Sequence, residues 1–478
     1  MNFISWSFVV LFSIVLAGRF LFGRRKTERS FVWFTMVAST VFVMWHVPIY
    51  ILVMLTSISV DYTAALLIDR APRDSTWRRA VLGVSMATNL LILGFFKYAD
   101  FSLKTVELSL NLMGFDVQLP RLGLILPIGI SFYTFGSMSY TIDVYRGRLR
   151  AIRRFQDFYY FVTFFPHLVA GPIVRAEQFF YQFARSRRPR LKVFNHAAFL
   201  IVRGAFLKIV CADNIARVVN IYWPQGYLRA CLGTPLENHA YSGDLAVLVL
   251  LFGAQIFCDF EGYSSIARGL AYLLGYRFPI NFRNPYIAGS FSNFWERWHI
   301  TLSSWLRDYL YRPLGGNRVS TTRTYDNLVI VMLLGGLWHG ASVTFVCWGA
   351  IHGMALAIER TLCLNRPARS AALRLTWYLV VQSVVMLAWI FFRSAGIGGA
   401  LTFISNIGDL KFGGLDRDIV LASTFLLPPA AMHLYGFLVE KSVVQPLGRL
   451  GQAALVGAML FAVMIMHGES SEFLYFQF

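Results

Sequence analysis

The chain carries little charge for its length. Only 14% of its 478 residues are Asp, Glu, Lys or Arg, and 56% are hydrophobic, whereas about a quarter of a soluble domain is charged. Apolar runs long enough to cross a hydrocarbon core of about 30 Å recur from end to end. This composition excludes an ordinary soluble protein and predicts a polytopic integral membrane protein.

The sequence also lacks the short segments of alternating polarity that mark a membrane β-barrel. Because backbone groups in lipid must be paired within a helix or a closed barrel, we expect an all-α bundle. There is no internal repeat and no linker, so residues 1–478 should form a single membrane-embedded domain. Broken helices in related halves would indicate a transporter, and the sequence has no such halves.

Several chemical signatures are missing. There is no GxxxxGK[ST] loop, which argues against a phosphate-cradling NTPase, and no HExxH, DxDxDG or GxSxG motif. The five cysteines are scattered without a CxxC, so they resemble small core residues and not a disulfide framework or zinc site. We therefore expect no metal site and no tightly bound cofactor.

Positive charge is concentrated in short clusters between the apolar runs. The formal net charge of +19 would suggest nucleic acid in a soluble protein, but basic residues confined to loops follow the positive-inside rule. We expect membrane lipid and no nucleic acid as partner, with an anionic cosubstrate from the cytosol as the alternative use of the charge. The clusters are Gly23–Arg29, Ala71–Arg79, Tyr145–Arg154, Arg185–Lys192 and Arg360–Arg374.

With these clusters on the cytosolic side, the apolar runs form about twelve spans. The positive charge follows the first run, so we expect a retained first span, and both termini should lie outside. Residues 98–121 should form an outside loop, 158–172 should dip in and return, and 281–318 should lie along the cytosolic face. The expected spans lie near residues 3–22, 31–47, 49–68, 80–97, 122–145, 196–220, 243–275, 326–341, 343–360, 375–393, 419–438 and 450–467.

The stretch GGLWHGAS, at 335–342, places a histidine late in an apolar segment. A buried imidazole is costly there unless it is hydrogen-bonded or used in chemistry. Gly335, Gly336 and Gly340 remove bulk around His339 and permit close approach of backbone or ligand. A structural histidine and a catalytic base near neutral pH both fit this pattern.

A second histidine lies in SFSNFWERWHITLSSWLRDYLYRPLGG, at 290–316. Aromatic and leucine residues recur there at helical spacing, which predicts an amphipathic helix in the membrane interface. His299 follows Trp295 by four residues and should flank the apolar face. It is either incidental or a second functional imidazole. The stripe comprises Trp295, Trp298, Leu302, Trp305, Leu306 and Tyr309, and the charged residues off it are Glu296, Arg297, Arg307 and Asp308.

Two other apolar stretches contain polar residues. His167 lies in FFPHLVAGP, whose prolines and glycine break helix and suit a re-entrant turn, and a structural hydrogen bond is its simplest role. Asp259 and Glu261 lie in FCDFEGYSS. These carboxylates either line a cavity or pair with Arg268 or Arg277.

Five stretches, taken in order, resemble the membrane-bound O-acyltransferase family. They are LPIGISFYTF, FYYFVTFFPHLVAGPI, FCDFEGYSSIARGLAYLLGYRFPINFRNPY, FWERWHITLSSWLRDYLYRPLGG and GGLWHGAS, and the ending FLYFQF resembles the bacterial branch that O-acetylates alginate. The resemblance covers nearly the whole chain. It departs at VMWHVPIY in the second span, where a more aromatic stretch is expected, which concerns the N-terminal spans and not the chemistry.

The resemblance implies a ring of tilted transmembrane helices around a tunnel, with re-entrant and interfacial helices. It assigns catalysis to His339 and an assisting catalytic role to His299, which follows the FWxxW stretch. The anionic part of a donor would meet Arg297, Arg307 and Arg312 of the 290–316 segment near the cytosolic mouth. The substrate-binding candidates are Trp338, Trp295, Trp298, Asp259, Glu261, Arg297 and Arg307.

The implied reaction moves an acyl group, acetyl by resemblance, from a cytosolic thioester such as acetyl-CoA to a hydroxyl outside the cytoplasmic membrane of a bacterium. The acceptor would be a cell-surface polysaccharide or a periplasmic acetyl-relay protein, within an exopolysaccharide-modification complex. Such a transfer needs a base, a stabilised oxyanion and exclusion of water. Neutral His339 would be the base, and His299 would polarise the carbonyl or hold the donor.

Three alternatives stay open at this point. D-alanyl transfer to teichoic acid from a carrier protein lies within the same family, and genes for a carrier protein and its ligase would accompany it. A transporter would show related halves. A structural membrane subunit without chemistry would not require His339.

Overall fold

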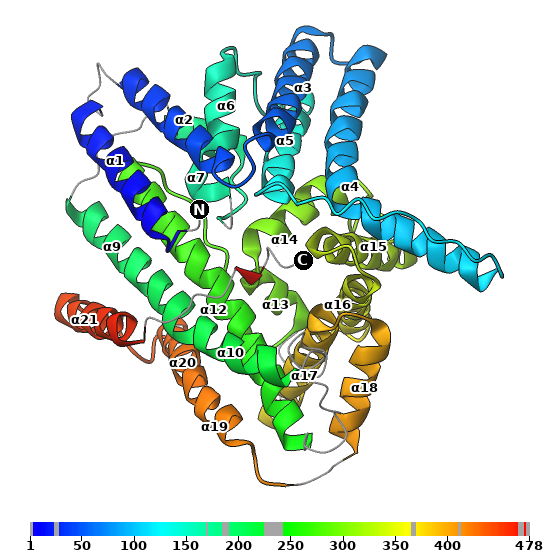
Figure 1. The fold of residues 1–478 in the computed structure, drawn as a ribbon, viewed down its shortest axis with the longest axis vertical. Coiled ribbons are helices and arrows are strands. Elements are labelled where there is room, and N and C mark those ends of the chain that lie inside the picture. The colour runs from blue at the N-terminus through cyan, green and yellow to red at the C-terminus, as the bar shows by residue number, and fades with distance from the viewer. Residues whose placement is uncertain are drawn as a thin grey trace. The chain divides into compact units, whose positions relative to one another are not determined.

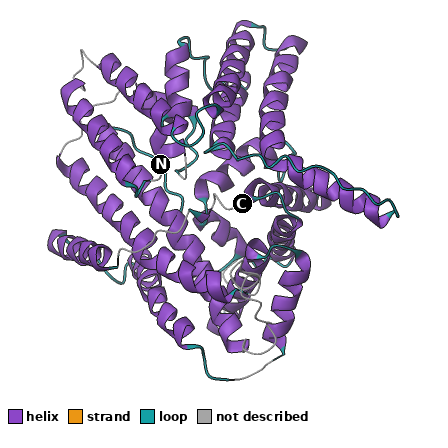
Figure 2. Ribbon diagram, viewed as in Figure 1, coloured by secondary structure: helices purple, strands orange, loops and turns teal. Residues whose placement is uncertain are grey.

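The computed structural model describes residues 3–22, 28–168, 171–183, 191–223, 242–364, 370–409, 413–466 and 473–474. All regular secondary structure in these ranges is helical (Figure 2). The predicted all-α fold is therefore confirmed. Arg24 and Arg188, which belong to two of the basic clusters used to orient the spans, lie outside the described residues.

The chain divides into two compact units, and the first comprises Met1–Ile201 and Ala267–Pro279. Within it, α3 packs against both α4 and α5, and α2 packs against α6. Its helices, drawn from blue to green in Figure 1, are α1 (Trp6–Phe22), α2 (Glu28–Met44), α3 (Tyr50–Arg70), α4 (Thr76–Leu112), α5 (Ile130–Tyr145), α6 (Phe155–Thr163), α7 (Phe165–Leu168), α8 (Ala176–Phe183) and most of α9 (Leu191–Ala205).

Helix α4 continues through residues that were expected to form a loop. The sequence predicted an outside loop at 98–121, but α4 runs on to Leu112, because this part of the loop contains neither proline nor glycine. The chain then turns back along the helix (Figure 1). The backbone N–H groups of Leu122 and Gly123 donate to the Asp100 carboxylate at 2.7 and 3.0 Å, so an acidic side chain holds this return.

Helix α5 begins later than the predicted span at 122–145. It starts at Ile130, after Pro127, whose ring disfavours helix in the residue before it. Gly129 has φ +70°, and a Cβ at this position would overlap the backbone carbonyl of Leu168. Only glycine therefore permits both this backbone conformation and the close approach of α7.

The second unit comprises Val202–Ile266 and Ile280–Phe478. In it, α15 packs along α16, and α16 packs against α17. Its helices are η1 (Phe206–Ala212), α10 (Asp213–Tyr222), α12 (Ser242–Leu274, whose last residues belong to the first unit), η3 (Pro285–Ile287), α13 (Phe291–Arg297), α14 (Ile300–Leu306), η4 (Arg307–Tyr311), α15 (Thr321–His339), α16 (Val343–Thr361), α17 (Ala371–Arg393), α18 (Ile397–Gly408), α19 (Arg417–Ser423), η5 (Thr424–Leu426), α20 (Leu427–Glu440) and α21 (Arg449–Ile465).

Six helical segments among the described residues are long and apolar enough to cross a membrane. The protein is therefore a multi-pass membrane protein. About twelve spans in a single domain, with both ends outside, stays a prediction. The six segments are Tyr50–Arg70, Thr76–Leu112, Lys192–Tyr222, Ser242–Leu273, Ala371–Arg393 and Arg417–Glu440.

The predicted orientation can be tested by cysteine labelling in intact cells. Residues Arg150 and Asp116 are both exposed in the structure. We expect an impermeant maleimide to label Asp116→Cys from outside, because it follows α4 on the predicted outer side, and to label Arg150→Cys only after permeabilisation. The background should be Cys363→Ser, since Cys363 is an exposed free cysteine. Labelling of Arg150→Cys in intact cells would reverse the span order.

Candidate active site

The segment predicted as one interfacial helix is broken at His299. Helix α13 ends at Arg297, α14 begins at Ile300, and His299 between them has the left-handed backbone angles φ 41° and ψ 53°. The prediction of one continuous helix is wrong because of this break, whereas His299 points away from water as expected, since it is 0% exposed. Such a conformation in a residue other than glycine costs about 1–3 kcal/mol and persists only where the surroundings impose it.

Asn281 holds this break in place. Its carbonyl oxygen accepts the backbone N–H of Ile300 at 2.8 Å, and its side-chain oxygen accepts the Thr301 hydroxyl at 2.6 Å. Its amide nitrogen donates to the hydroxyl of Ser264 on α12 at 2.9 Å. One buried amide therefore connects α12 to the first turn of α14. Because Asn281 lies eighteen residues before His299, helical periodicity alone could not reveal the break.

The break brings His299 to the end of α15, where His339 is the last helical residue. The centroids of the two imidazole rings are 6.5 Å apart. Trp338 lies beside both, at 6.0 Å from His299 and 5.0 Å from His339. The structure thus brings together three residues that the sequence analysis had named, although forty positions separate the histidines.

The glycines around His339 serve helix packing. A Cβ on Gly336 or Gly340 would overlap Phe345 of α16, and one on Gly349 would overlap the backbone of Met332. Small residues let two membrane helices approach closely. Gly336 and Gly349 therefore permit close backbone approach of α15 and α16, which sets the position of His339 at the end of α15.

Aromatic rings enclose the two imidazoles. The His339 ring lies 5.0 Å from Trp348 and 5.4 Å from Phe392, and the edge of His299 meets Phe260 at 4.6 Å. Aromatic rings in such contacts prefer edge-to-face geometry. Both histidines are almost completely buried, His299 at 0% and His339 at 4% exposure.

The two ring nitrogens of His299 are available for hydrogen bonds to a ligand. Neither of its ring nitrogens hydrogen-bonds to another of the described residues. It lies outside the six candidate spans, and burial lowers the pKa of His299 to about 3, so the ring is neutral at physiological pH. A neutral imidazole has one N–H donor and one acceptor to offer.

Sequence reasoning missed His352 on α16. This residue is 0% exposed, and its ring stacks on Phe294 at 5.9 Å and meets Trp295 at 5.1 Å. Trp348 lies 4.8 Å from it on one side and 5.0 Å from His339 on the other. The helical spacing of Trp348 and His352 in an apolar segment is the signal that could have found it.

Trp295 and Trp298, two of the three tryptophans in the 290–316 segment, occupy different positions. Trp298 is 1% exposed and packs between Phe294, at 5.6 Å, and Trp389, at 4.9 Å. Trp295 is half-buried and meets Trp348 at 5.7 Å. Trp295 thus contacts Trp348, the ring that lies against His339, whereas Trp298 is packed in the core beside the break at His299.

Asp259 belongs to a buried group of ion pairs. Lys208, on the π-helical turn η1, is 0% exposed, and its Nζ lies 2.7 Å from Asp213 and 2.8 Å from Asp259. The other Asp259 oxygen accepts the backbone N–H of Leu474 at 2.7 Å. The partner is therefore a lysine and not one of the two arginines considered from the sequence. Paired in this way, Asp259 compensates a buried cation.

Glu261 and Arg297 are also engaged. Glu261 pairs with Arg203 at 2.9 Å, again not with either expected arginine. Arg297 makes a two-pronged contact with Glu440 at 3.0 and 2.8 Å, a geometry that guanidinium and carboxylate favour. Either residue would have to exchange its partner before it could bind a substrate.

Arg307 is the more accessible cation. Its side chain is 57% exposed, and it contacts Asp308 at 3.2 Å. Arg312 contacts the same carboxylate at 3.0 Å and is 61% exposed. The carboxylate itself is buried, with a side-chain exposure of 6%, so the two guanidinium groups reach the surface while their shared partner does not. Over the ranges that the structure describes, no group of three or more His, Cys, Asp or Glu is placed to hold a metal ion.

Comparison with known sequences identifies the family. A sequence model of MBOAT, the membrane-bound O-acyltransferase family, matches residues 148–396, about half of the chain. The chain belongs to this family. The match includes His299, Trp338 and His339, so the cluster described above lies within the family's own region.

Named relatives agree with this assignment. The "Probable alginate O-acetylase AlgI" of Azotobacter vinelandii is 36% identical over 454 residues, which are 94% of this chain and 87% of that protein. The "Peptidoglycan O-acetyltransferase" of Helicobacter pylori is 32% identical over 422 residues, 83% of this chain and 77% of that protein. The "Teichoic acid D-alanyltransferase" of Streptococcus thermophilus is 30% identical over 267 residues, 52% of this chain and 61% of that protein. The protein is a membrane O-acyltransferase.

Substitutions at His299 should separate its backbone role from its side-chain role. Asparagine and glycine both accept the left-handed conformation, but only asparagine keeps a hydrogen-bonding side chain. We expect His299→Asn to retain more acyl transfer than His299→Gly, at equal membrane abundance, and His299→Ala to lose about 1 kcal/mol or more of stability as well. The measurement is acetyl incorporation per inserted protein. Equal loss in the Asn and Gly variants would indicate proton transfer by His299.

The buried lysine gives a stability prediction. Lys208→Met leaves two carboxylates uncompensated and should destabilise the protein by about 3–5 kcal/mol, measured as thermal or denaturant unfolding in one detergent. The exposed Lys192→Met is the matched control. The triple variant with Asp213→Asn and Asp259→Asn should recover much of the loss. Wild-type stability in Lys208→Met would show that Lys208 does not compensate these carboxylates.

Proposed function

We propose that this enzyme transfers an acetyl group from cytosolic acetyl-CoA to a hydroxyl outside the membrane, on a polysaccharide or on a relay partner protein. The observation that carries the proposal is the pair of buried imidazoles, His299 and His339, 6.5 Å apart within an aromatic enclosure. An acyl transfer needs two such groups, one to take a proton and one to stabilise charge.

His339 is the proposed general base. As the acceptor oxygen attacks the thioester carbonyl, its proton passes to the neutral imidazole, and the same proton leaves with the departing thiolate. A positioned base of this kind contributes about 10²–10⁴-fold to the rate. The helix contacts of Gly336 and Gly340 support this role, because they hold the end of α15 in one place.

His299 is the proposed partner for the carbonyl oxygen. Its ring nitrogens have no hydrogen bond to other described residues, so its N–H is available to the oxyanion that forms during attack. A donor aimed at such an oxyanion is worth about 10²–10³-fold in rate. The packing of the His299 ring against Phe260 and Trp338 holds this donor in place, and a preorganised donor needs little reorganisation during the reaction.

Exclusion of water is the third requirement. Trp338, Trp348, Phe260 and Phe392 surround the two imidazoles. A dry enclosure strengthens the hydrogen bonds to the oxyanion and protects the thioester from hydrolysis. Because these rings come from four different helices, the enclosure depends on the assembled second unit.

The donor's phosphates would bind at exposed arginines. Arg307 and Arg312 share one carboxylate and are both more than half exposed, so they can accept anionic oxygens. Arg297 is held by Glu440 and contributes to the fold of this region. The chain itself would then need no tightly bound cofactor.

The acetyl group and the acceptor are inferred from the relatives. The two O-acetyltransferase relatives align over 83–94% of the chain, whereas the D-alanyltransferase aligns over 52%, and this favours acetyl transfer over D-alanyl transfer. We place the enzyme in the cytoplasmic membrane of a bacterium, in an exopolysaccharide-modification complex. Transfer of label from acetyl-CoA to polymer in inside-out membrane vesicles tests this directly.

Substitution of His339 tests the proposed base. His339→Ala and His339→Gln should both insert normally and lower polymer O-acetylation by about 10²–10⁴-fold, because glutamine keeps hydrogen bonds but cannot take a proton at neutral pH. The measurement is polymer acetylation in a deletion strain, with membrane abundance by immunoblot. His196→Gln, which changes a histidine of α9, is the matched control. Near-normal acetylation with His339→Gln would show a structural histidine.

A further inference from the structure

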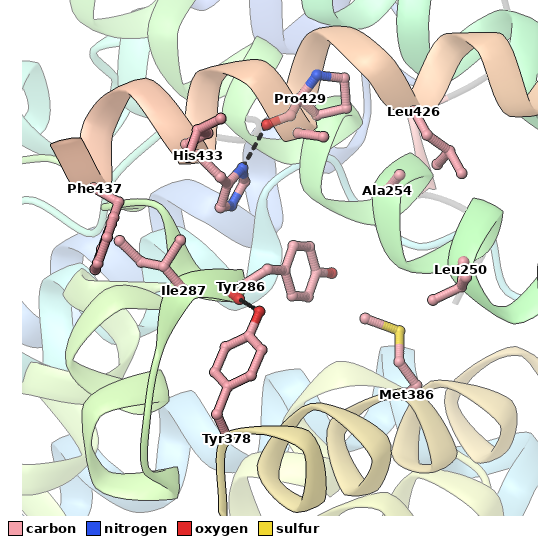
Figure 3. A pocket seen from close by; sticks show the side chains of 12 residues that line it. Leu250, Ala254, Tyr286, Ile287, Tyr378, Met386, Leu426, Pro429, His433 and Phe437 are labelled. Carbon is pink, nitrogen blue, oxygen red and sulfur yellow. Dashed lines mark hydrogen bonds between the residues drawn. The ribbon is translucent and has the colours of Figure 1, made fainter. Parts of the chain in front are cut away.

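We propose that a cavity lined by α12, η3, α17, η5 and α20 binds a neutral membrane lipid through a hydroxyl group. The cavity has a volume of about 580 Å³ (Figure 3), which is within the range of about 300–1,000 Å³ for small-molecule sites. Neither His299 nor His339 lines it, so this proposal does not depend on the proposed reaction.

The walls of the cavity belong to helices that are long and apolar enough to cross a membrane. Helices α12, α17 and α20 lie within three of the six candidate spans, and the lining is mostly apolar. Leu250, Leu434 and Phe437 line the cavity and are 48%, 58% and 39% exposed. Apolar surface therefore continues from the cavity onto the outside of these spans, and hydrocarbon is the medium from which a ligand would enter.

One polar group in the cavity lacks a partner. The Nδ1 atom of His433 lies 2.7 Å from the carbonyl oxygen of Pro429, one turn earlier on α20. Since a carbonyl can only accept, Nδ1 carries the proton and Nε2 is an acceptor. Nε2 makes no hydrogen bond within the described part of the chain, although the side chain is only 6% exposed. A buried acceptor without a donor is unfavourable, so a ligand hydroxyl would fit here.

The neighbouring hydroxyl groups are already engaged. Figure 3 shows the His433 ring turned from α20 toward Tyr286, and the two rings stack at 5.5 Å. The Tyr286 hydroxyl donates to the carbonyl of Gly253 at 2.6 Å, and the Tyr378 hydroxyl donates to the carbonyl of Tyr286 at 3.0 Å. The tyrosine protons are thus used elsewhere, and His433 needs a donor from the ligand.

The charges near the cavity favour an uncharged head group. Arg203 and Arg297 are close enough to act electrostatically on His433. However, Arg203 is paired with Glu261, and Arg297 is paired with Glu440. A phosphate would meet guanidinium groups that are already neutralised, and it would lose its hydration in an apolar cavity. A single hydroxyl on a long apolar chain matches both the walls and the free acceptor.

The test is photolabelling of the full-length protein in lipid nanodiscs. The probe is a long-chain primary alcohol with a diazirine in its chain, and labelled peptides are located by mass spectrometry. We expect labelling on α17 and α20. Ala430→Phe, at an exposed position of the lining, should fill the cavity, and His433→Leu should remove the acceptor. His433→Leu should lower labelling about fivefold or more, as expected for loss of a buried hydrogen bond, and Ala430→Phe should lower it at least as much by occupying the space of the ligand.

Two controls decide the outcome. Ala431→Phe, at the adjacent exposed position outside the lining, should be labelled like the wild type. The methyl ether of the same alcohol cannot donate a hydrogen bond, so it should label the wild type weakly and His433→Leu to the same low extent. Equal labelling of the wild type by ether and alcohol, stronger labelling by the phosphate monoester, or an unchanged Ala430→Phe would each overturn the proposal.

Discussion

The position of His299 depends on one buried residue, Asn281, through its backbone carbonyl and its side-chain amide. Its hydrogen bonds to Ile300, Thr301 and Ser264 impose a left-handed backbone on His299 between two short helices. In one continuous helix, the direction of the His299 side chain would be fixed by the helical repeat alone. The break instead sends the chain past α12 and turns the imidazole toward the end of α15, where the other histidine lies.

The approach of α15 and α16 supplies the other half of the cluster. Glycines at their interface allow backbone contact that a single methyl group would prevent, and this contact places His339 against Trp348. The buried charged groups of the same unit depend on electrostatic pairing instead of close packing. Lys208, Asp213 and Asp259 are buried only because they compensate one another. Close packing and charge pairing together leave two buried imidazoles within a shell of aromatic rings.

Local sequence patterns correctly predicted the class and family of the protein. They failed where a residue distant in the sequence determines the local structure. The apolar runs correctly predicted a helical membrane protein, and the motifs correctly predicted the family. The helical spacing of aromatic and leucine residues in 290–316 suggested one helix. Periodicity contains no information about Asn281, which lies outside the segment and bonds to its residues at the break. The predicted ion-pair partners of Asp259 and Glu261 were wrong, because the observed partners, Lys208 and Arg203, lie more than fifty residues away in the sequence. His352 was overlooked because its importance comes from the rings packed around it.

By itself, the sequence determined the class of the protein, its family and the two histidines of greatest interest, because hydrophobicity and motif order are properties of the chain that need no coordinates. Only the tertiary structure decided that the histidines meet, that glycines between α15 and α16 serve packing, and that the carboxylates of α12 are already paired. It also created the cavity at His433, whose walls come from segments nearly two hundred residues apart. The physical reason is that hydrogen bonds, ion pairs and ring contacts between distant segments are made only when the helices assemble, and no local pattern encodes them.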